Sequence, residues 1–534
     1  MLRIFFVLIV AAAFVSVAVG QAGEIDLSFR SVGYLVTNPF NDPTRASEAR
    51  SVALQTDGKI IIGANDHRTT TNTNGLILRY TADGAIDTTF SGGQNGDGIS
   101  SIGFPGVSTQ YLNGLVVQAD GKIVALATYE NESDGDIGFY IIRLNTNGTR
   151  DQTFGGNGTS FRVFSAITGG GGLAQDIALQ SDGKILIAAA SPNFATQTFE
   201  FAVYRLNRDG TSDRTFGGGI SGRSMVNIGS GNDIPTGIAV APDGRIVLAG
   251  TADATQSGPG GVALARFSAA GVLDTSFGTG GRIVTSLGGV SELLSDVEVQ
   301  ADGKPIISGI TCSGINCSSE TGAVARFNAN GSFDTTFDGD GVAKPQIPAS
   351  TGNALTSLEI QPDGRIVATG NSTSTGTGSD NLVLRLNTDG SQDSTFSNDG
   401  VAVTDIGGTD QASAALALQT DGKIVTTGAS STGSRIDIAI FRYLGDSQPA
   451  ANVTVSGRVT TPDGRALRNA TVSLTDLAGV RRSATTSSFG FYSFDQVSIS
   501  GPYTVTVTSR RFRFASRSIQ VNGNLADVDF VGLE

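Results

Sequence analysis

Apolar and polar residues alternate in short runs along most of this chain, and the period of the alternation is two. Residues 177–180, the turn Ser181–Gly183 and residues 184–187 form one such unit. Two alternating runs around an Asp-Gly turn predict a β-hairpin, because a strand points successive side chains to opposite faces. No repeated unit has the period of an amphipathic helix. The pattern predicts an all-β protein.

Three sequence signals recur in a fixed order and divide the first part of the chain into repeats. Each signal occurs seven times, and the Asp residues of successive Asp-Gly turns are 63, 62, 61, 59, 61 and 58 residues apart. This spacing indicates one supersecondary unit copied in tandem. The signals are an Asp-Gly turn (Asp57, Asp120, Asp182, Asp243, Asp302, Asp363, Asp421), an Arg before an apolar residue (Arg79, Arg143, Arg205, Arg266, Arg326, Arg385, Arg442) and Asp-x-x-Phe (Asp26, Asp87, Asp151, Asp213, Asp274, Asp334, Asp393).

The register of the repeats favours a closed ring over an open array. Asp26 precedes the first complete unit, and the last unit ends after Arg442 without an Asp-x-x-Phe of its own. The N-terminal segment therefore supplies what the last unit lacks, as in a β-propeller closed by a borrowed strand. An open solenoid would need distinct caps. We expect a seven-bladed β-propeller over residues 21–446.

The repeats resemble a known family of exported bacterial proteins. Residues 418–425, residues 385–390 and the segment Asp393–Phe396 together look like the delta-60 repeat, whose members are expected to form β-propellers. Pro305 departs from the pattern, since the other copies carry Ile or Val there, and it suits a strand start or edge. The resemblance implies a fold and export, and it implies no activity.

A second domain follows a short polar linker at residues 447–451. Residues 452–534 contain several short alternating runs separated by turns, which predict a small antiparallel β-sandwich. This stretch is similar to the carboxypeptidase regulatory-like domain, although Leu467 stands where a Pro is frequent. The resemblance implies a module that supports, spaces or binds and does not catalyse.

The first twenty residues have the composition of a targeting segment. Arg3 is followed by an apolar run and by small residues that end at Gly20, which predicts a secretory signal peptide cleaved before Gln21. An uncleaved membrane anchor is the alternative. If the segment is cleaved, we expect no part of the mature chain to insert into a membrane. Cys312 and Cys317 are the two cysteines, and in an exported protein they predict a small loop-closing disulfide.

The net charge of the chain and its distribution narrow the classes of possible binding partner. The formal net charge is −13, which argues against nucleic acid. The acidity lies in residues 21–451, with 26 basic and 43 acidic residues, whereas residues 452–534 hold nine Arg and six acidic residues. Strand alternation would put Arg511, Arg513 and Arg517 on one face and Phe512 and Phe514 on the other. That Arg face is either solvated surface or a docking surface for an anionic partner.

Residues that could support catalysis are few. His67 is the only His, the sequence offers no nucleophile elbow beside it, and we expect it in an exposed loop. Glycoside hydrolysis needs only two carboxylates, so an enzyme stays open as an alternative. The absence of Trp weakens sugar stacking and quinone binding. No cofactor is expected, apart from a calcium ion at one loop.

Calcium has two candidate sites in the sequence. Asn207–Asp213 resembles the middle of a calcium-binding loop, and the first ligand of such a loop would fall at Arg205. A cation at a ligand position argues against calcium. We expect instead a tight turn there and an Arg–Asp ion pair in each blade. The better candidate combines four carboxylates in seven residues, with a solvated acidic loop as the alternative. Its ligands would be Glu130, Glu132, Asp134 and Asp136.

These observations together predict an exported, non-enzymatic binding or scaffold protein at the cell surface. Its partner would be a polysaccharide or a surface protein, recognised through loops that differ between the repeats. Those loops are 66–74, 129–136, 191–198 and 311–321. A secreted enzyme that acts on glycans and a purely structural spacer are the alternatives, and the oligomeric state stays open.

Overall fold

The protein is described by a computed structural model that covers most of residues 21–533. Among the described residues, no helix is long and apolar enough to cross a membrane; the one helical element is the short 3-10 turn η1 (Phe216–Gly218). The description omits residues 1–20, 43, 70–71, 91–95, 104–108, 131–136, 157–158, 165–173, 220–221, 255–259, 315–318, 408–409, 434, 447–452, 477–480, 498–500, 522–524, 527 and 534.

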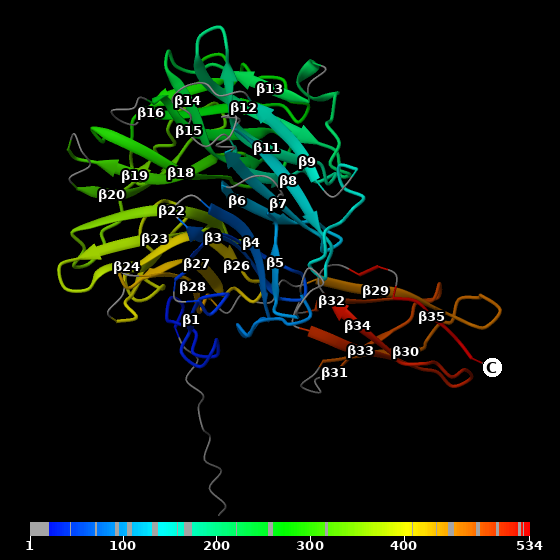
Figure 1. Ribbon diagram of the computed structural model, residues 1–534. Helices are drawn as coiled ribbons and strands as arrows, with labels where there is room; N and C mark the ends of the chain where they lie inside the picture. The colour runs from blue at the N-terminus through cyan, green and yellow to red at the C-terminus, as the bar shows by residue number, and fades with distance from the viewer. Residues whose placement is uncertain are drawn as a thin grey trace, which may run out of the picture.

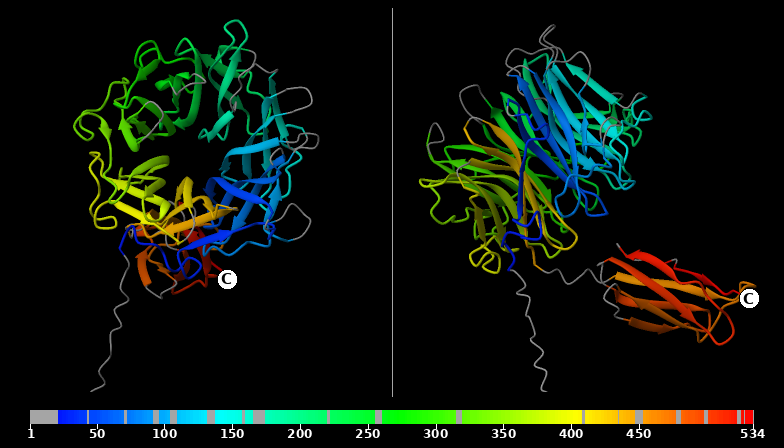
Figure 2. Two further views of the ribbon diagram at one scale, coloured as in Figure 1. Left: turned by 60° about the vertical axis from the view of Figure 1, so that its left-hand side comes forward. Right: turned by 60° about the horizontal axis from the view of Figure 1, so that its bottom comes forward.

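The N-terminal region forms four-stranded antiparallel sheets, called blades 1 to 7, that surround a central space (Figure 1; Figure 2, left). The innermost strand of each blade leads into the Asp-Gly turn. The strands are β2 (Ala46–Leu54), β3 (Ile60–Thr69), β4 (Asn72–Tyr80) and β5 (Ile99–Ser101) in blade 1; β6 (Thr109–Val117), β7 (Ile123–Glu130), β8 (Ile137–Leu144) and β9 (Thr159–Phe164) in blade 2; β10 (Ala174–Leu179), β11 (Ile185–Asn193), β12 (Thr198–Leu206) and β13 (Arg223–Val226) in blade 3; and β14 (Asn232–Val240), β15 (Ile246–Ala254), β16 (Gly261–Phe267) and β17 (Arg282–Thr285) in blade 4.

The remaining blades repeat this order, and the last one includes the first strand of the chain. Blades 1 and 2 share one eight-stranded sheet, because β4 and β6 meet at the single pair Thr73–Thr109. Counting that sheet as two blades matches the seven repeats. The strands are β18 (Ser291–Val299), β19 (Pro305–Cys312), β20 (Glu320–Arg326) and β21 (Val342–Ala343) in blade 5; β22 (Gly352–Ile360), β23 (Ile366–Ser374), β24 (Gly378–Leu386) and β25 (Val401–Thr404) in blade 6; and β26 (Asp410–Leu418), β27 (Ile424–Ser431), β28 (Ile436–Tyr443) and β1 (Tyr34–Thr37) in blade 7.

The two ends of the repeat region close the ring together, as the sequence predicts. Strand β1 pairs antiparallel with β28, from Tyr34–Phe441 to Thr37–Ile438, and completes blade 7. Pairing with β1 satisfies the backbone groups of an edge that β28 would otherwise leave open. The all-β class and the propeller arrangement are confirmed. Pro305 begins β19, which also agrees with the expectation for that position.

The core lies between neighbouring blades. Alternate residues of each strand point toward the adjacent sheet, so each hydrophobic cluster combines side chains of two blades. Between blades 2 and 3, for example, Phe139 packs with Tyr204 at 5.3 Å between ring centroids, and Phe154 belongs to the same cluster. The ring is therefore held by a series of similar interfaces, and no single central core exists for one blade alone.

Each blade also contains the expected Arg–Asp pair, in the same arrangement every time. The Arg Nε donates to the Asp carboxylate at 2.8 or 2.9 Å. The guanidinium lies 4.3 to 4.9 Å from the ring centroid of the Phe in Asp-x-x-Phe. In blade 7 the pair joins Arg442 to Asp26, which are 416 residues apart. The prediction of a structural ion pair is confirmed, and we call this group the Arg–Asp–Phe cluster.

The cluster also connects neighbouring blades. In six blades the Arg Nη1 donates to a backbone carbonyl oxygen of the next blade, as Arg442 does to Ala82. In blade 6, Arg385 instead donates to the carboxylate of Asp446 at 2.8 Å. Asp446 follows the last propeller strand, so it fixes the point where the chain leaves the ring.

The C-terminal region is a separate β-sandwich (Figure 1, orange and red). Its core includes Val455, Val472, Tyr492 and Val505. The preceding strand β28 ends at Tyr443, and the predicted linker at 447–451 lies outside the described residues. One sheet has the order β32 (Phe491–Val497), β29 (Val453–Thr460), β35 (Phe530–Val531), and the other has β31 (Arg481–Thr485), β30 (Thr471–Thr475), β33 (Gly501–Thr508), β34 (Arg517–Val521).

The strand predicted around Arg511–Arg517 is wrong. Strand β33 ends at Thr508, opposite Thr471, where its partner β30 begins. Between β33 and β34, which starts only at Arg517, the segment pairs at a single point, the bridge between Arg513 and Leu533, and this does not make a strand. Arg511, Arg513 and Arg517 are nevertheless exposed, while Phe512 and Phe514 are half-buried.

Candidate functional site

Every innermost strand of the ring is interrupted at the same place. The pairing of these seven strands with the second strand of their blade shifts register around one extra residue, seven positions before the Asp of the Asp-Gly turn. A β-bulge of this kind re-aims a side chain and increases the local twist. The bulge residues are Arg50, Asn113, Gln175, Thr236, Ser295, Thr356 and Ala414.

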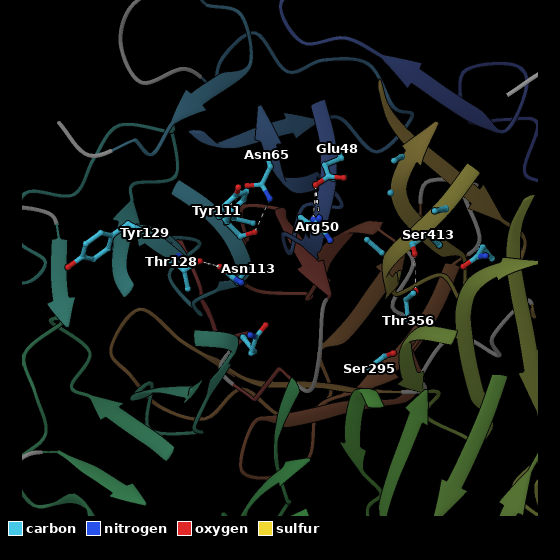
Figure 3. Close-up of a pocket in the computed structure, with 18 of the residues that line it drawn as sticks. Glu48, Arg50, Asn65, Tyr111, Asn113, Thr128, Tyr129, Ser295, Thr356 and Ser413 are labelled. Atoms are coloured by element: carbon cyan, nitrogen blue, oxygen red, sulfur yellow. Dashed lines mark hydrogen bonds and ion pairs between the residues drawn. The ribbon is translucent and has the colours of Figure 1, made fainter. Parts of the chain in front are cut away.

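Six of the seven bulge residues line one cavity, and Thr236 of blade 4 is the exception. The cavity has a volume of about 720 Å³ and lies at the entry of the innermost strands (Figure 3). Arg50 and Asn113 face Ser295 and Thr356 across it. On one side the cavity is also lined by Tyr111, Tyr129 and Glu130 of blade 2. The wall is therefore a ring of side chains from different blades, and we call it the bulge ring.

Blade 1 contributes an ion pair to the rim of the cavity. Arg50 Nη2 lies 2.6 Å from Glu48 Oε1, and His67 Nε2 lies 3.4 Å from the same oxygen. Burial alone would raise the pKa of Glu48, but the hydrogen bond with His67 and the Arg50 charge hold that pKa below its usual range. Glu48 is therefore an anion over the whole physiological range. Arg50 keeps about half of its side chain exposed and can contact a ligand.

Below the bulge ring, four carboxylates point toward the channel from blades 3, 5 and 6. We call these residues the carboxylate layer: Asp176, Asp296, Glu298 and Glu359. Asp176 accepts the backbone N–H of Ile238, in the next blade, at 3.0 Å. Asp296 accepts the equivalent N–H of Leu358 at 2.9 Å. These two Asp side chains thus connect innermost strands that share no ladder.

The carboxylate layer resists ionisation. Burial raises the pKa of Asp176 to about 7, with a further contribution from the charge of Asp296. Burial likewise raises the pKa of Asp296 to about 6, against three hydrogen bonds that lower it. Glu298 and Glu359 are enclosed and repel each other, so both pKa values lie above the usual range of Glu. Groups of this kind gather at functional sites more often than elsewhere in a protein.

The far end of the channel is apolar. A second cavity, of about 400 Å³, lies where the innermost strands reach their Asp-Gly turns. Its wall includes Leu54, Val117, Leu179 and Leu418, together with Glu359. The carboxylate layer thus lies between a polar cavity and an apolar one.

Only one of the residues predicted to bind calcium lies in the described part of the chain. Glu130 ends β7 and lines the 720 Å³ cavity. Glu132, Asp134 and Asp136 lie outside the described residues, so the calcium site stays a prediction. Within the described ranges, no group of three or more His, Cys, Asp or Glu side chains could hold a metal ion.

Other predicted positions have mixed outcomes. Cys312 is buried at the end of β19, but Cys317 lies outside the described residues, so their disulfide stays a prediction. The expectation of an exposed loop His is wrong, because His67 is in β3, opposite Ala46 of β2, and its Nδ1 lies 3.0 Å from Thr73 Oγ1. The apolar run ends before His67, but β3 continues through His67 because it pairs with β2 on one side and β4 on the other.

The bulge ring is the part of the site that the sequence analysis missed. The variable loops named there contribute Tyr129 and Glu130 to the cavity, whereas most of its wall comes from the innermost strands. A signal was available, since the seven bulge residues all stand seven positions before the Asp of an Asp-Gly turn. At that position the repeats carry Arg, Asn, Gln, Thr, Ser, Thr and Ala, inside segments that are otherwise similar.

Comparisons with solved structures find matches of low similarity. A protein of unknown function from Dyadobacter fermentans is 11% identical over 78% of this chain and 98% of its own, with a TM-score of 0.41. A polysaccharide lyase described as an ulvan lyase is also 11% identical, over 80% and 96%, with a TM-score of 0.41. An α-L-arabinofuranosidase from Fusarium graminearum is 13% identical over 66% and 96%, with a TM-score of 0.38. These scores carry no argument about activity, and no curated protein matches the sequence.

Family models match both parts of the chain. The DUF5122 β-propeller domain, a domain of unknown function, matches six segments: 55–90, 118–154, 180–216, 241–277, 300–337 and 361–396. Each match runs from an Asp-Gly turn to the Phe of Asp-x-x-Phe. The seventh repeat is divided between the two ends of the propeller, which explains why a continuous match finds only six. The carboxypeptidase regulatory-like domain matches residues 454–531. The chain is thus a DUF5122 β-propeller repeat protein that ends in a carboxypeptidase regulatory-like domain.

Proposed function

We propose that this chain is an exported, non-enzymatic binding or scaffold protein that recognises a polar partner, a polysaccharide or a surface protein, at the bulge ring. The observation that carries the proposal is the contrast within the repeat. The Arg–Asp–Phe cluster has the same chemistry in seven blades, while the bulge residues differ and six of them meet at one cavity. Side chains that differ between copies of a repeat are suited to the recognition of an asymmetric ligand.

The chemistry of the wall fits a partner rich in hydroxyl and amide groups. Arg50 and Asn113 offer a charged donor and an amide, and Ser295 and Thr356 offer hydroxyls, all at fixed places on paired strands. Tyr111 adds a partly exposed ring on which an apolar sugar face or a side chain can lie. The cavity of about 720 Å³ accommodates a few sugar units or a short peptide loop.

Binding to polysaccharides and to cells tests this proposal. The mature chain should bind at least one extracted surface polysaccharide or surface protein of the source organism saturably, as measured by pull-down and titration calorimetry. Replacing Arg50 and Asn113 together by Ala should weaken that binding at least tenfold, since two directed polar contacts are lost. Thr236→Ala is the matched control, because Thr236 is a bulge residue that does not line the cavity. Equal loss of binding in the control, or no binding by the parent, would contradict the proposal.

One observation favours a second candidate, an enzyme that acts on glycans. The carboxylate layer breaks the repeat symmetry, and raised pKa values suit a general acid. Release of new reducing ends from a polysaccharide, abolished by Glu359→Gln, would establish turnover. A purely structural spacer would instead show neither binding nor turnover.

A further inference from the structure

The carboxylate layer brings four acidic residues together in the middle of the ring without a basic residue among them. At the two channel-facing positions that form it, the other blades contribute Ser, Gly, Ala and Val, with no Lys, Arg or His. Those positions are one and three residues after the bulge. The four acidic residues act on one another, because Asp296 raises the pKa of Asp176, Glu298 and Glu359. No other titratable side chain of the innermost strands shares these two positions.

Glu359 is the member of the layer that is placed to contact a ligand. Its side chain is half-buried and lines the second cavity. Within the described part of the chain, it has no hydrogen-bond or ion-pair partner. A carboxylate placed in this way is costly to ionise unless a cation accompanies it. Asp176 and Asp296, in contrast, each accept backbone N–H groups and have a structural role.

A single metal ion does not suit this arrangement. A metal needs several ligands around one point, and no group of three acidic side chains in the described ranges meets that condition. The charges are instead spread along the channel, because Asp296 and Glu298 are two residues apart on one strand, which corresponds to about 6.5–7 Å. The wall next to Glu359 is apolar, with Val117, Leu179 and Leu418.

From this geometry we infer that the channel binds an aliphatic polyamine, a methylene chain that carries two or more ammonium groups. The ammonium groups pair with the carboxylate layer, and the methylene groups lie against the leucine and valine side chains of the second cavity. Ammonium groups separated by three or four carbons match the spacing of carboxylates two residues apart on a strand. Polyamine binding would occur in the carboxylate layer below the bulge ring. It therefore does not depend on whether the bulge ring binds a polysaccharide or a surface protein.

The test uses spermidine and the full mature chain in titration calorimetry and thermal unfolding. At pH 8 and 0.15 M NaCl we expect saturable binding and a higher midpoint of unfolding. At pH 5 the layer holds its protons, and binding should be at least tenfold weaker. The double variant Glu298→Gln/Glu359→Gln should lose at least tenfold in affinity at pH 8. It should also fold well, because it loses a repulsion between two enclosed charges.

The control removes the same charge elsewhere. The double variant Asp182→Asn/Asp302→Asn changes two exposed turn residues of blades 3 and 5 and should bind spermidine like the parent. If both double variants lose affinity equally, the attraction is a diffuse effect of the acidic surface, and the inference fails. It also fails if CaCl₂ binds in place of spermidine, or if the parent does not bind spermidine at pH 8. Should the Glu double variant misfold, the single variant Glu359→Gln carries the same expectation with a smaller loss.

Discussion

The Arg–Asp–Phe cluster and the bulge ring are two regions of the same repeat with opposite behaviour. The cluster is chemically the same in every blade, and its Arg residues are at most 7% exposed. The bulge residue occupies an equally fixed place in the backbone, yet its side chain changes from Arg to Ala around the ring. A position can therefore recur in every blade for two reasons: its side chain has the same role each time, or only its backbone conformation is the same.

The difference lies in what each side chain holds. An Arg of the cluster pairs with its own blade and donates to the next one, so it fixes the angle between blades. Six of the seven bulge side chains line the cavity, and among them Asn113 and Thr356 also hydrogen-bond to neighbouring strands. Within the described residues, Arg50 and Ser295 make no hydrogen bond to another blade that would hold the ring. Changes at these two positions should consequently separate stability from binding.

The largest effect is expected from removing the cluster that closes the ring. Arg442→Ala should reduce the free energy of unfolding by about 3–5 kcal/mol, because it leaves buried Asp26 with only the more distant Lys423, at 3.8 Å, as a cation and removes the Arg442 link to the N-terminal segment. Urea unfolding monitored by circular dichroism measures this loss. Arg208→Ala, at a turn of blade 3, is the control and should stay within about 0.5 kcal/mol of the parent. A loss below about 1 kcal/mol for Arg442→Ala would show that the cluster is dispensable.

The second effect concerns pH. A carboxyl group whose pKa is raised by folding stabilises the protein below its usual pKa near 4, and that stability is lost as the pH rises through 6 to 7. The parent should therefore lose about 1–2 kcal/mol between pH 5 and pH 8. This figure allows for the water that reaches the channel. In Glu298→Gln/Glu359→Gln the loss should be smaller.

The Arg–Asp pairs respond in the opposite sense and in another range. Their Asp residues have pKa values below the usual range despite burial, owing to hydrogen bonds and the paired cations. Their stabilisation is thus present above about pH 4 and is lost only in stronger acid. Thermal unfolding from pH 2 to pH 9 should show two flanks, and only the upper one should change in the Glu double variant. An unchanged upper flank would contradict the assignment of that flank to the carboxylate layer.

Much of the fold could be predicted from local patterns. The Asp-Gly turns fix the hairpins, because Gly takes a positive φ of 79–88° in all seven of them. The position of Asp26 ahead of the first full repeat was enough to predict ring closure. The strand around Arg511–Arg517 failed for the opposite reason, since its extent depends on the length of a partner strand that alternation does not reveal.

The site was harder to predict, and for a physical reason. A bulge is a mismatch between two strands, so Arg50 or Ser295 looks like any polar residue in a half-buried strand until the pairing is known. The carboxylate layer is equally hidden, because Glu298 and Glu359 belong to different blades and act on each other only when the ring closes. The constant offset from the Asp-Gly turn would have marked these positions for comparison, although not the cavity that they share.

The bulge ring should contribute least to stability. Arg50→Ala and Ser295→Ala should each change the free energy of unfolding by less than about 0.5 kcal/mol, because both side chains face the cavity. Glu48 keeps His67 as a partner when Arg50 is removed. Urea unfolding of these two variants and of Arg442→Ala under the same conditions would measure the smallest and the largest expected losses of free energy of unfolding. A loss above about 2 kcal/mol in either variant would mean that the bulge side chains support the fold, and their variation between blades would then need a packing explanation instead of a binding one.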